Sequence, residues 1–172
     1  IVTHGGDAPN VVPGRTEGAW YVRAATLAAL EELSPRVQRC FESGALATGC
    51  DVEVELKGPR YSEFLPDATL LAAYAREATA VGRILPAEGE DRGLAGSTDM
   101  ANVSLRVPTI HPMLAIEADG AVNHQPEFTA AAARPSAHRA VLDGALAMAR
   151  TVIAVAEDPA ARATLLAAAA RS

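Results

Sequence analysis

The sequence predicts an α/β protein whose first third is of the α+β kind. Three observations support this class. The first 57 of the 172 residues follow strand-like and helix-like patterns in the order β, β, α, β. Segments with helical periodicity dominate the remainder. Between them, residues 58–66 are rich in proline, glycine and charge, which indicates a linker. We therefore expect one domain over residues 1–57 and a second over residues 58–172.

The first part begins with strand-like segments. A β-branched run at residues 1–3 precedes a Gly-Gly turn, and residues 10–12 are extended and end at a Pro-Gly turn. Side chains alternate over residues 17–23, so we predict that this segment and residues 10–12 form a hairpin. Residues 50–57 alternate valine and leucine with acidic residues, which is typical of a half-buried strand.

Helical spacing predicts most of the other elements. Thr26 can cap a helix that ends at Gly49, and Pro35 within it either kinks the helix or restarts it. Further helices are expected over residues 67–85, 136–156 and 159–171. A polar loop is expected over residues 86–95, a short strand over 103–107 and an apolar segment over 113–116.

Composition and charge exclude several function classes. With 15 Lys and Arg against 21 Asp and Glu, the net charge of −6 offers no basic field for nucleic acid. Arg162 interrupts the alanine-rich residues 160–170, a stretch shorter than the roughly 20 apolar residues that span a bilayer. Only Cys40 and Cys50 are present, too few for a secreted disulfide framework, which indicates a reducing, cytoplasmic setting. The chain starts without Met, so we expect a missing upstream part.

Two sites could bind substrate or support a metal. Asn10 and Arg23 lie on the strands of the predicted hairpin, where an amide and a guanidinium could together hold a carboxylate. The alternative is a turn asparagine and a solvated arginine. The tight turn formed by Gly96, Ser97, Thr98 and Asp99 could support a metal ligand through its carboxylate, or it could be an ordinary loop or helix cap.

Two of the four histidines are candidates for a site. His124 lies in the polar segment Asn123–Phe128, where a neutral imidazole could bind zinc. His111 follows an apolar strand and equally fits a structural histidine. His4 and His138 are weaker candidates, since His138 falls in the first turn of a predicted helix. The sequence contains no nucleophile elbow, phosphate-binding glycine loop or HExxH motif.

Four segments, taken in order, resemble the M20 family of metallopeptidases and amidohydrolases. They read GGDAPNVVP, EGAWYVRA, GSTDMANVSLRVPTIHP and NHQPEF. Each motif is weak alone, but four in the correct order with fitting spacing are specific. The chain looks closest to the branch that contains aminoacylase-1-like protein 2 and the aminobenzoyl-glutamate hydrolases, and the resemblance covers nearly all of its length.

The resemblance implies a ferredoxin-like βαββαβ lid that forms a homodimer, and a zinc-exopeptidase-like α/β catalytic domain. That domain would hold two divalent metal ions, zinc, manganese or cobalt. Residues 1–57 would be the later part of the lid and residues 58–172 the C-terminal part of the catalytic domain. The resemblance further implies that Asn10 and Arg23 bind the carbonyl and carboxylate of the substrate, and that His124 is the last metal ligand.

By the same resemblance, the Gly96–Asp99 turn and His111 would line the cleft, with His111 among the residues that bind the substrate. The family's other metal ligands and its general base lie upstream of the lid, so no catalytic residue is expected in this chain. We therefore expect the C-terminal portion of a hydrolase for amide bonds next to a free carboxylate, as in N-acyl amino acids, dipeptides or aminobenzoyl-glutamate.

Alone, the chain is expected to be inactive and to require its N-terminal half, in cis or as a separate chain. Two alternatives stay open at this stage. One is a non-catalytic dimerisation or interaction module, and the other is a regulatory binder of free amino acids.

Overall fold

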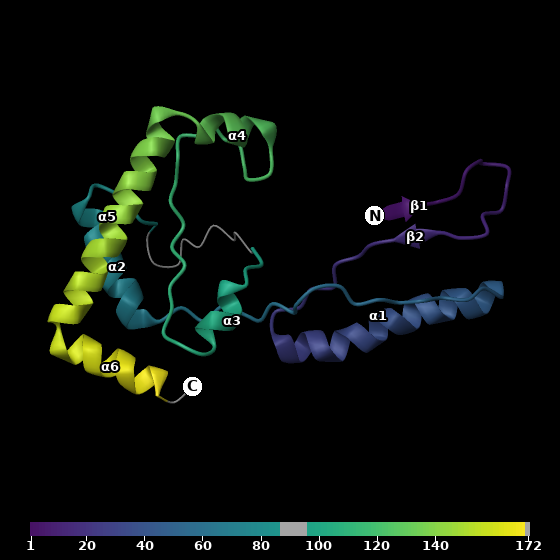
Figure 1. The fold of residues 1–172 in the computed structure, drawn as a ribbon, viewed down its shortest axis with the longest axis horizontal. Helices are drawn as coiled ribbons and strands as arrows, with labels where there is room; N and C mark the ends of the chain where they lie inside the picture. The colour runs from purple at the N-terminus through teal and green to yellow at the C-terminus, as the bar shows by residue number, and fades with distance from the viewer. Residues whose placement is uncertain (87–95, 171–172) are drawn as a thin grey trace. The chain divides into compact units, whose positions relative to one another are not determined.

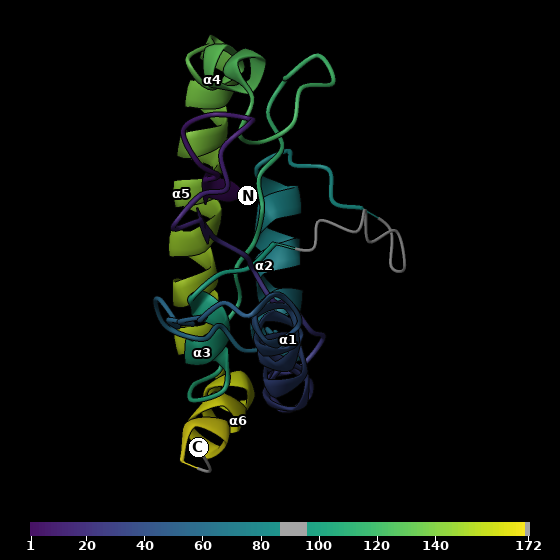
Figure 2. The same ribbon diagram turned by 90° about the vertical axis from the view of Figure 1, so that its right-hand side faces the viewer.

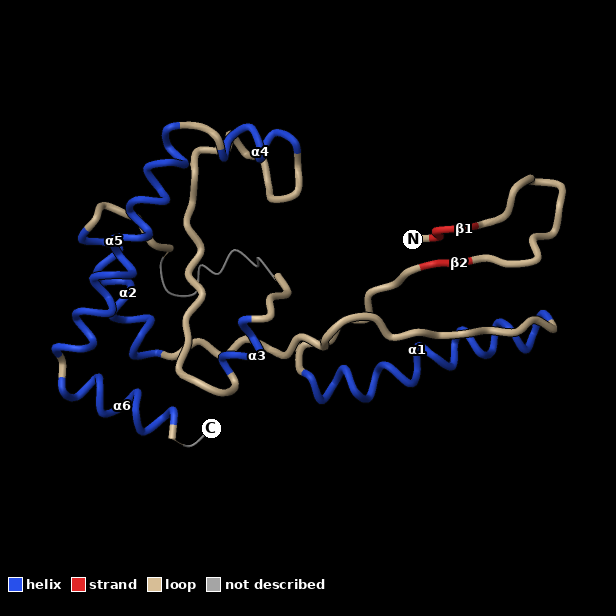
Figure 3. The backbone as a smooth tube through the Cα atoms, in the orientation of Figure 1, coloured by secondary structure: helices blue, strands red, loops and turns tan. Residues whose placement is uncertain are grey.

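The computed structural model describes residues 1–86 and 96–170, and the chain divides into two compact units, Ile1–Glu63 and Phe64–Ser172. Helices dominate the described residues, with one two-stranded antiparallel sheet, which is compatible with an α/β or α+β class (Figures 1 and 3). In chain order the elements are β1 (Val2–His4), β2 (Glu17–Gly18), α1 (Leu27–Thr48), α2 (Ala68–Ala80), α3 (Met100–Ser104), α4 (Pro126–Ala132), α5 (Pro135–Glu157) and α6 (Pro159–Ala169).

The sheet of the first unit pairs β1 with β2, so the predicted hairpin between residues 10–12 and 17–23 is wrong. Beyond the ladder, the amino group of Ile1 donates to the Ala19 carbonyl at 2.8 Å, and the Ala19 N–H donates back to the Ile1 carbonyl at 2.9 Å. These bonds extend the pairing by one residue beyond β2, and residues 10–12 instead form part of the loop that joins the two strands.

The helix predicted after Thr26 is confirmed as α1. The Thr26 side chain accepts a hydrogen bond from the Ala29 N–H at 3.2 Å, and Gly49 ends the helix in the left-handed conformation at φ 69°. Pro35 lies inside one continuous helix and does not divide it. Phe41 of α1 packs against Trp20, which follows β2, with 4.8 Å between the centres of the two rings.

The strand predicted over residues 50–57 is wrong. This segment has no ladder partner among the described residues, and Val52, Val54 and Leu56 are 44%, 41% and 76% exposed. An alternating pattern produces a strand only where a second strand accepts its backbone hydrogen bonds. The ferredoxin-like lid therefore stays a prediction.

At the centre of the second unit, α2 packs against α5 (Figures 1 and 2). Tyr74 and Ala78 of α2 form the buried core with Ala147 of α5, and Tyr74 is only 3% exposed. Burial raises the pKa of the Tyr74 phenol, and the nearby positive charge of Arg83 partly opposes that rise.

The predicted helices of the second unit are confirmed, although α2 ends at Ala80 and not at residue 85. Asp67 caps α2 by accepting from the Leu70 N–H at 2.9 Å, and Asp158 caps α6 by accepting from the Ala160 N–H at 2.9 Å. The strand predicted over residues 103–107 is wrong, because this segment overlaps the short helix α3. Nearly all of the loop predicted over residues 86–95 lies outside the described residues.

The core is small for the length of the chain. The accessible surface is 13,103 Å², whereas two separate compact domains of these lengths would together expose about 9,600 Å². Among the described residues, the buried hydrophobic ones apart from Tyr74 are all alanines, and the larger aliphatic side chains are exposed or half-buried. No helix within the described ranges combines the length and the apolar character required to cross a bilayer.

Candidate functional site

Asn10 and Arg23 both belong to the first unit, but neither lies in a strand. Asn10 is the third residue of a turn that the Val11 N–H closes by donating to the Ala8 carbonyl at 3.2 Å. The guanidinium of Arg23 lies 5.5 Å from the centre of the Tyr21 ring, a cation–π contact at the surface. Their predicted placement on adjacent strands is wrong, while their roles in binding stay a prediction.

His111 and His124 belong to the second unit, where an extended segment connects them. We call residues 110–118 the strap. Its first residue, Ile110, packs against the α2–α5 core. Leu114 fits over Gly144 of α5, so close that a Cβ built on this glycine would lie 2.2 Å from the Leu114 Cδ1. The strap can therefore lie against α5 because this helix has no side chain at that point.

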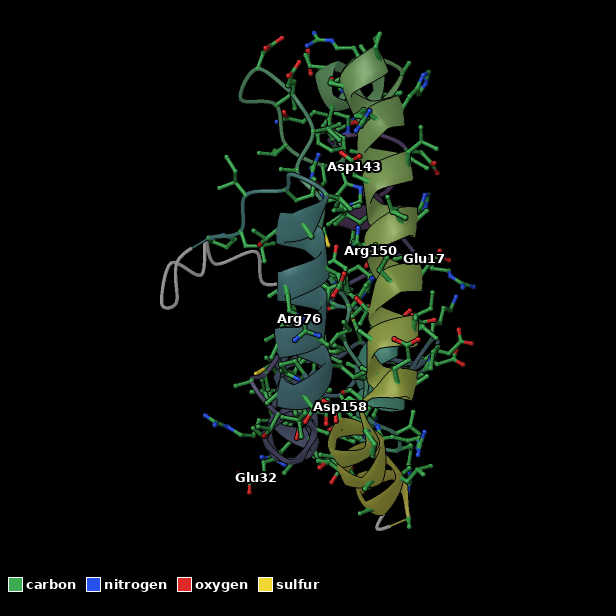
Figure 4. All side chains as sticks on the ribbon, turned by 90° about the vertical axis from the view of Figure 1, so that its left-hand side faces the viewer. Glu17, Glu32, Arg76, Asp143, Arg150 and Asp158 are labelled. Carbon is green, nitrogen blue, oxygen red and sulfur yellow. The ribbon has the colours of Figure 1, made fainter. Side chains whose placement is uncertain are left out.

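Charged groups hold the middle of the strap. The guanidinium of Arg83 donates a hydrogen bond to the Ala115 carbonyl and lies 3.6 Å from the carboxylate of Asp143. The same carboxylate accepts from Nε of Arg139 at 2.8 Å. Asp143 is 8% exposed and lies on the side of α5 that faces α2 (Figure 4). One buried carboxylate on α5 thus orients the arginine that binds the strap.

A third arginine holds the far end of the strap. Arg134 donates to the Asp119 carboxylate at 2.7 Å and to the Glu117 carbonyl at 3.3 Å. It is also the N-cap residue of α5. The path of the chain from the strap toward His124 is therefore fixed relative to the start of α5.

His124 itself adopts an uncommon backbone conformation. Its φ angle is +68°, in the left-handed region that residues with a side chain rarely adopt, and its side chain is exposed. The Gln125 side chain closes this turn by accepting from the Val122 N–H at 3.2 Å, and α4 begins at Pro126. The imidazole therefore lies at a strained turn directly before a helix, in a segment predicted only as a polar loop.

His111 and the Gly96–Asp99 turn approach the same short segment of chain. The His111 ring lies 6.3 Å from the ring of Phe64, edge to face. The turn leads directly into α3, where Ser104 accepts from the N–H of Leu65 at 3.0 Å. The structure thus brings His111 and the helix after the turn together along residues 64–65.

Within the turn, the backbone is held by local hydrogen bonds. The Thr98 hydroxyl accepts from the Met100 N–H at 3.3 Å, and the Thr98 carbonyl accepts from the Ala101 N–H at 3.2 Å. Asp99 occupies the N-cap position of α3 without a capping hydrogen bond from its side chain, and it is exposed. Its carboxylate is thus not used to cap the helix that follows.

The described residues do not complete a metal centre by themselves. Across residues 1–86 and 96–170, no group of three or more His, Cys, Asp and Glu side chains could hold an ion. A shallow depression of about 330 Å³ adjoins the strap, and neither candidate histidine is among its lining residues, which are Arg83, Ala115, Ile116, Glu117, Ser136 and Arg139. This arrangement orients side chains but does not itself supply a catalytic constellation.

Sequence reasoning missed the residues that hold the strap. Arg83, Arg134 and Asp143 are far apart in the sequence, and Gly144 lies inside a predicted helix. Two local signals could have drawn attention to them. Arg139 and Asp143 have the i, i+4 spacing of a helical ion pair, and a glycine inside a helix has a conformational cost that close packing can justify.

Comparison with known proteins gives the second line of evidence. No family model matches the chain. It is 37% identical to the mouse (Mus musculus) Xaa-Arg dipeptidase over 161 residues, which is 93% of the chain and 37% of that protein. It is 35% identical to the human (Homo sapiens) Xaa-Arg dipeptidase over 160 residues, which is 92% of the chain and 36% of that protein. These similarities relate the chain to a family of peptidases, and it spans little more than a third of these curated relatives.

Proposed function

We propose that this chain is the C-terminal portion of an M20-type, metal-dependent hydrolase that cleaves an amide bond next to a free carboxylate. The observation that carries the proposal is the similarity to two Xaa-Arg dipeptidases, which extends over more than nine tenths of the chain. Among the substrates that the sequence suggested, the names of these relatives favour dipeptides over N-acyl amino acids and aminobenzoyl-glutamate. Within the M20 type, we propose that the chain belongs to the branch that contains aminoacylase-1-like protein 2 and the aminobenzoyl-glutamate hydrolases.

Asn10 and Arg23 are proposed to orient the substrate. A guanidinium can bind a carboxylate through two parallel hydrogen bonds, and a side-chain amide can donate to a carbonyl oxygen. Both residues are exposed in the first unit. Dipeptides carry a free carboxylate next to the bond that is cleaved. The guanidinium of Arg23 would bind that carboxylate, and the amide of Asn10 would bind the carbonyl oxygen of the bond.

His124 is proposed as one ligand of the metal centre. Its support is the left-handed backbone at φ +68° combined with an exposed imidazole, since backbone strain at an exposed polar residue is often retained for function. The described residues do not provide the further ligands. We assign those ligands and the general base to the part of the enzyme outside this chain, and the isolated chain is proposed to be inactive.

The metal and activity of the assembled enzyme test this function. This chain is joined to the part of the mouse Xaa-Arg dipeptidase that it does not match, in place of the matched residues, and the chimera is assayed for bound metal and dipeptide hydrolysis. The proposal expects about two metal ions per chimera and none on the isolated chain. A chimera that folds but neither retains metal nor hydrolyses dipeptides would contradict it.

Arg23→Ala tests the carboxylate contact in the same chimera. Losing a charged hydrogen bond of about 1.5–3 kcal/mol should raise KM for dipeptides about 10- to 150-fold. Dipeptide amides, which lack the free carboxylate, serve as the matched substrates and should be affected much less. An equal effect on both substrate types would remove Arg23 from the site.

A dimerisation module without catalysis is the second candidate. The favouring observation is the segment 50–57, which has no strand partner among the described residues and exposes Val52, Val54 and Leu56. Such a segment can pair with another chain along its edge. This candidate expects a stable dimer of the isolated chain, and charged replacements at Val54 should abolish that dimer.

A further inference from the structure

Helix α5 is apolar on two sides. The side that packs within the second unit consists of small residues, among them Ala140, Gly144 and Ala147, which are all buried. On the other side, large apolar residues line the helix. We call these six residues the outer face: Val141, Leu142, Leu146, Met148, Val152 and Ile153, with exposed fractions of 68%, 67%, 50%, 58%, 69% and 55%.

The outer face is broad and uncharged. At 3.6 residues per turn, its members extend over an arc of about 160° around the helix. Between Val141 and Ile153, the only charged residues are Asp143 and Arg150, which lie outside this arc and bind Arg83, Arg139 and Glu77. On a helix, an apolar stripe wider than about 100° is characteristic of the face that packs against another part of a protein.

The distribution of residue sizes supports the same conclusion. Valine, leucine, isoleucine and methionine are among the types most often buried. On α5 the six members of the outer face are nevertheless exposed, whereas the buried hydrophobic residues of this helix are alanines. Single apolar residues on a surface are common in monomeric proteins. A contiguous exposed patch of six large apolar residues is not, and such patches mark surfaces of interaction. The outer face is therefore suited to burial against another part of a protein.

We propose that the outer face of α5 is the surface on which the remaining part of the enzyme packs. The occupant is the polypeptide that corresponds to the part of the Xaa-Arg dipeptidases outside the matched residues, about 63% of the mouse protein. This inference rests on one part of the proposed function, namely that the chain is a portion of such an enzyme.

The width of the face distinguishes this occupant from a second copy of α5. Two helices pair along a seam that is narrower than the roughly 100° stripe of an ordinary surface helix. An arc of about 160° needs a sheet or several elements to cover it. The absence of charge within the arc also requires an apolar partner surface, because an unpaired buried charge would be costly.

Thiol labelling of single-cysteine variants tests the packing. Cys40 and Cys50, both exposed, are first replaced by serine. Leu146→Cys then places a thiol on the outer face, and Glu32→Cys places a control thiol on the exposed surface of α1. Each variant is prepared as the isolated chain, as the mouse chimera and as a co-expressed complex with the unmatched mouse polypeptide, and maleimide labelling rates are compared.

In the isolated chain, both thiols should react at rates within a few-fold of each other. In the chimera or the complex, Leu146→Cys should slow by about tenfold or more, while Glu32→Cys changes less than about twofold. Equal labelling of the two thiols after assembly, or failure of the chimera to fold together with failure of the complex to form, would overturn the inference. Protection of Leu146→Cys in the isolated chain that grows with concentration would assign the face to a second copy instead.

Activity separates this inference from the proposed function. A chimera with a protected Leu146→Cys thiol but without metal or hydrolysis would retain the packing surface and refute the enzyme. A chimera that hydrolyses dipeptides while Leu146→Cys labels freely would retain the enzyme and refute the packing surface.

Discussion

Gly144 of α5 and Leu114 of the strap are matched in shape. A Cβ on the glycine would lie 2.2 Å from the Leu114 Cδ1, well inside contact distance. Because Leu114 lies between His111 and His124 in the sequence, this contact links the packing of α5 to the segment that carries both candidate site residues.

The first prediction concerns this contact. Gly144→Ala should gain up to about 1 kcal/mol of helix propensity but lose it to the displacement of Leu114, so that stability is unchanged or falls. In a Leu114→Ala background, the same change should stabilise by about 0.5–1 kcal/mol. Urea unfolding of the four proteins followed by circular dichroism measures both values. Stabilisation by Gly144→Ala in the original chain would refute the shape match.

Asp143→Asn tests the carboxylate that orients Arg83. The side chains of Asp143 and Arg83 are 11% and 20% exposed, so losing this charge should destabilise the second unit by about 1–3 kcal/mol, less than for a fully buried pair. Asp119→Asn is the matched control, because its pair with Arg134 is largely exposed and should contribute under about 1 kcal/mol. Equal losses in urea unfolding would mean that burial of the Asp143 pair is unimportant.

Tyr74 predicts a loss of stability at alkaline pH. Burial raises the pKa of its phenol above the ordinary value of 10.0. Between the unfolded and folded pKa values, the unfolded state has released the proton while the folded state still holds it, so stability falls as pH rises. The stabilising effect is complete below pH 10 and is lost through the folded pKa. Unfolding of the original chain and Tyr74→Phe from pH 8 to 12 should show a smaller fall in the variant.

The backbone conformation of His124 predicts an unusual order of stability among variants at this position. At φ +68°, glycine should be more stable than alanine by about 1 kcal/mol, because only glycine adopts this region without strain. His138 is the control, because it lies in α5, where alanine should be more stable than glycine by about 0.5–1 kcal/mol. Thermal unfolding of the four variants should therefore give opposite signs at the two histidines. Matching signs would place His124 in an ordinary conformation.

The long helices could be predicted from the sequence. Thr26 predicted a helix start, Gly49 predicted its end, and the helices expected from residues 67 and 159 begin next to the caps Asp67 and Asp158, because capping bonds and the i→i−4 ladder lie within one segment. The strands were predicted less well. Residues 10–12 and 50–57 have strand-like patterns but no ladder among the described residues, because a strand depends on a distant partner.

The contacts that hold the candidate residues could not be predicted from the sequence. The contacts of Arg83 with Asp143 and of Leu114 with Gly144 join positions that are 60 and 30 residues apart, so no local pattern could reveal them. The left-handed backbone of His124 likewise follows from the path between the strap and α4. A residue's chemical type can be read directly from the sequence. Its orientation depends on contacts between segments that are distant in the sequence, and local patterns do not reveal these contacts.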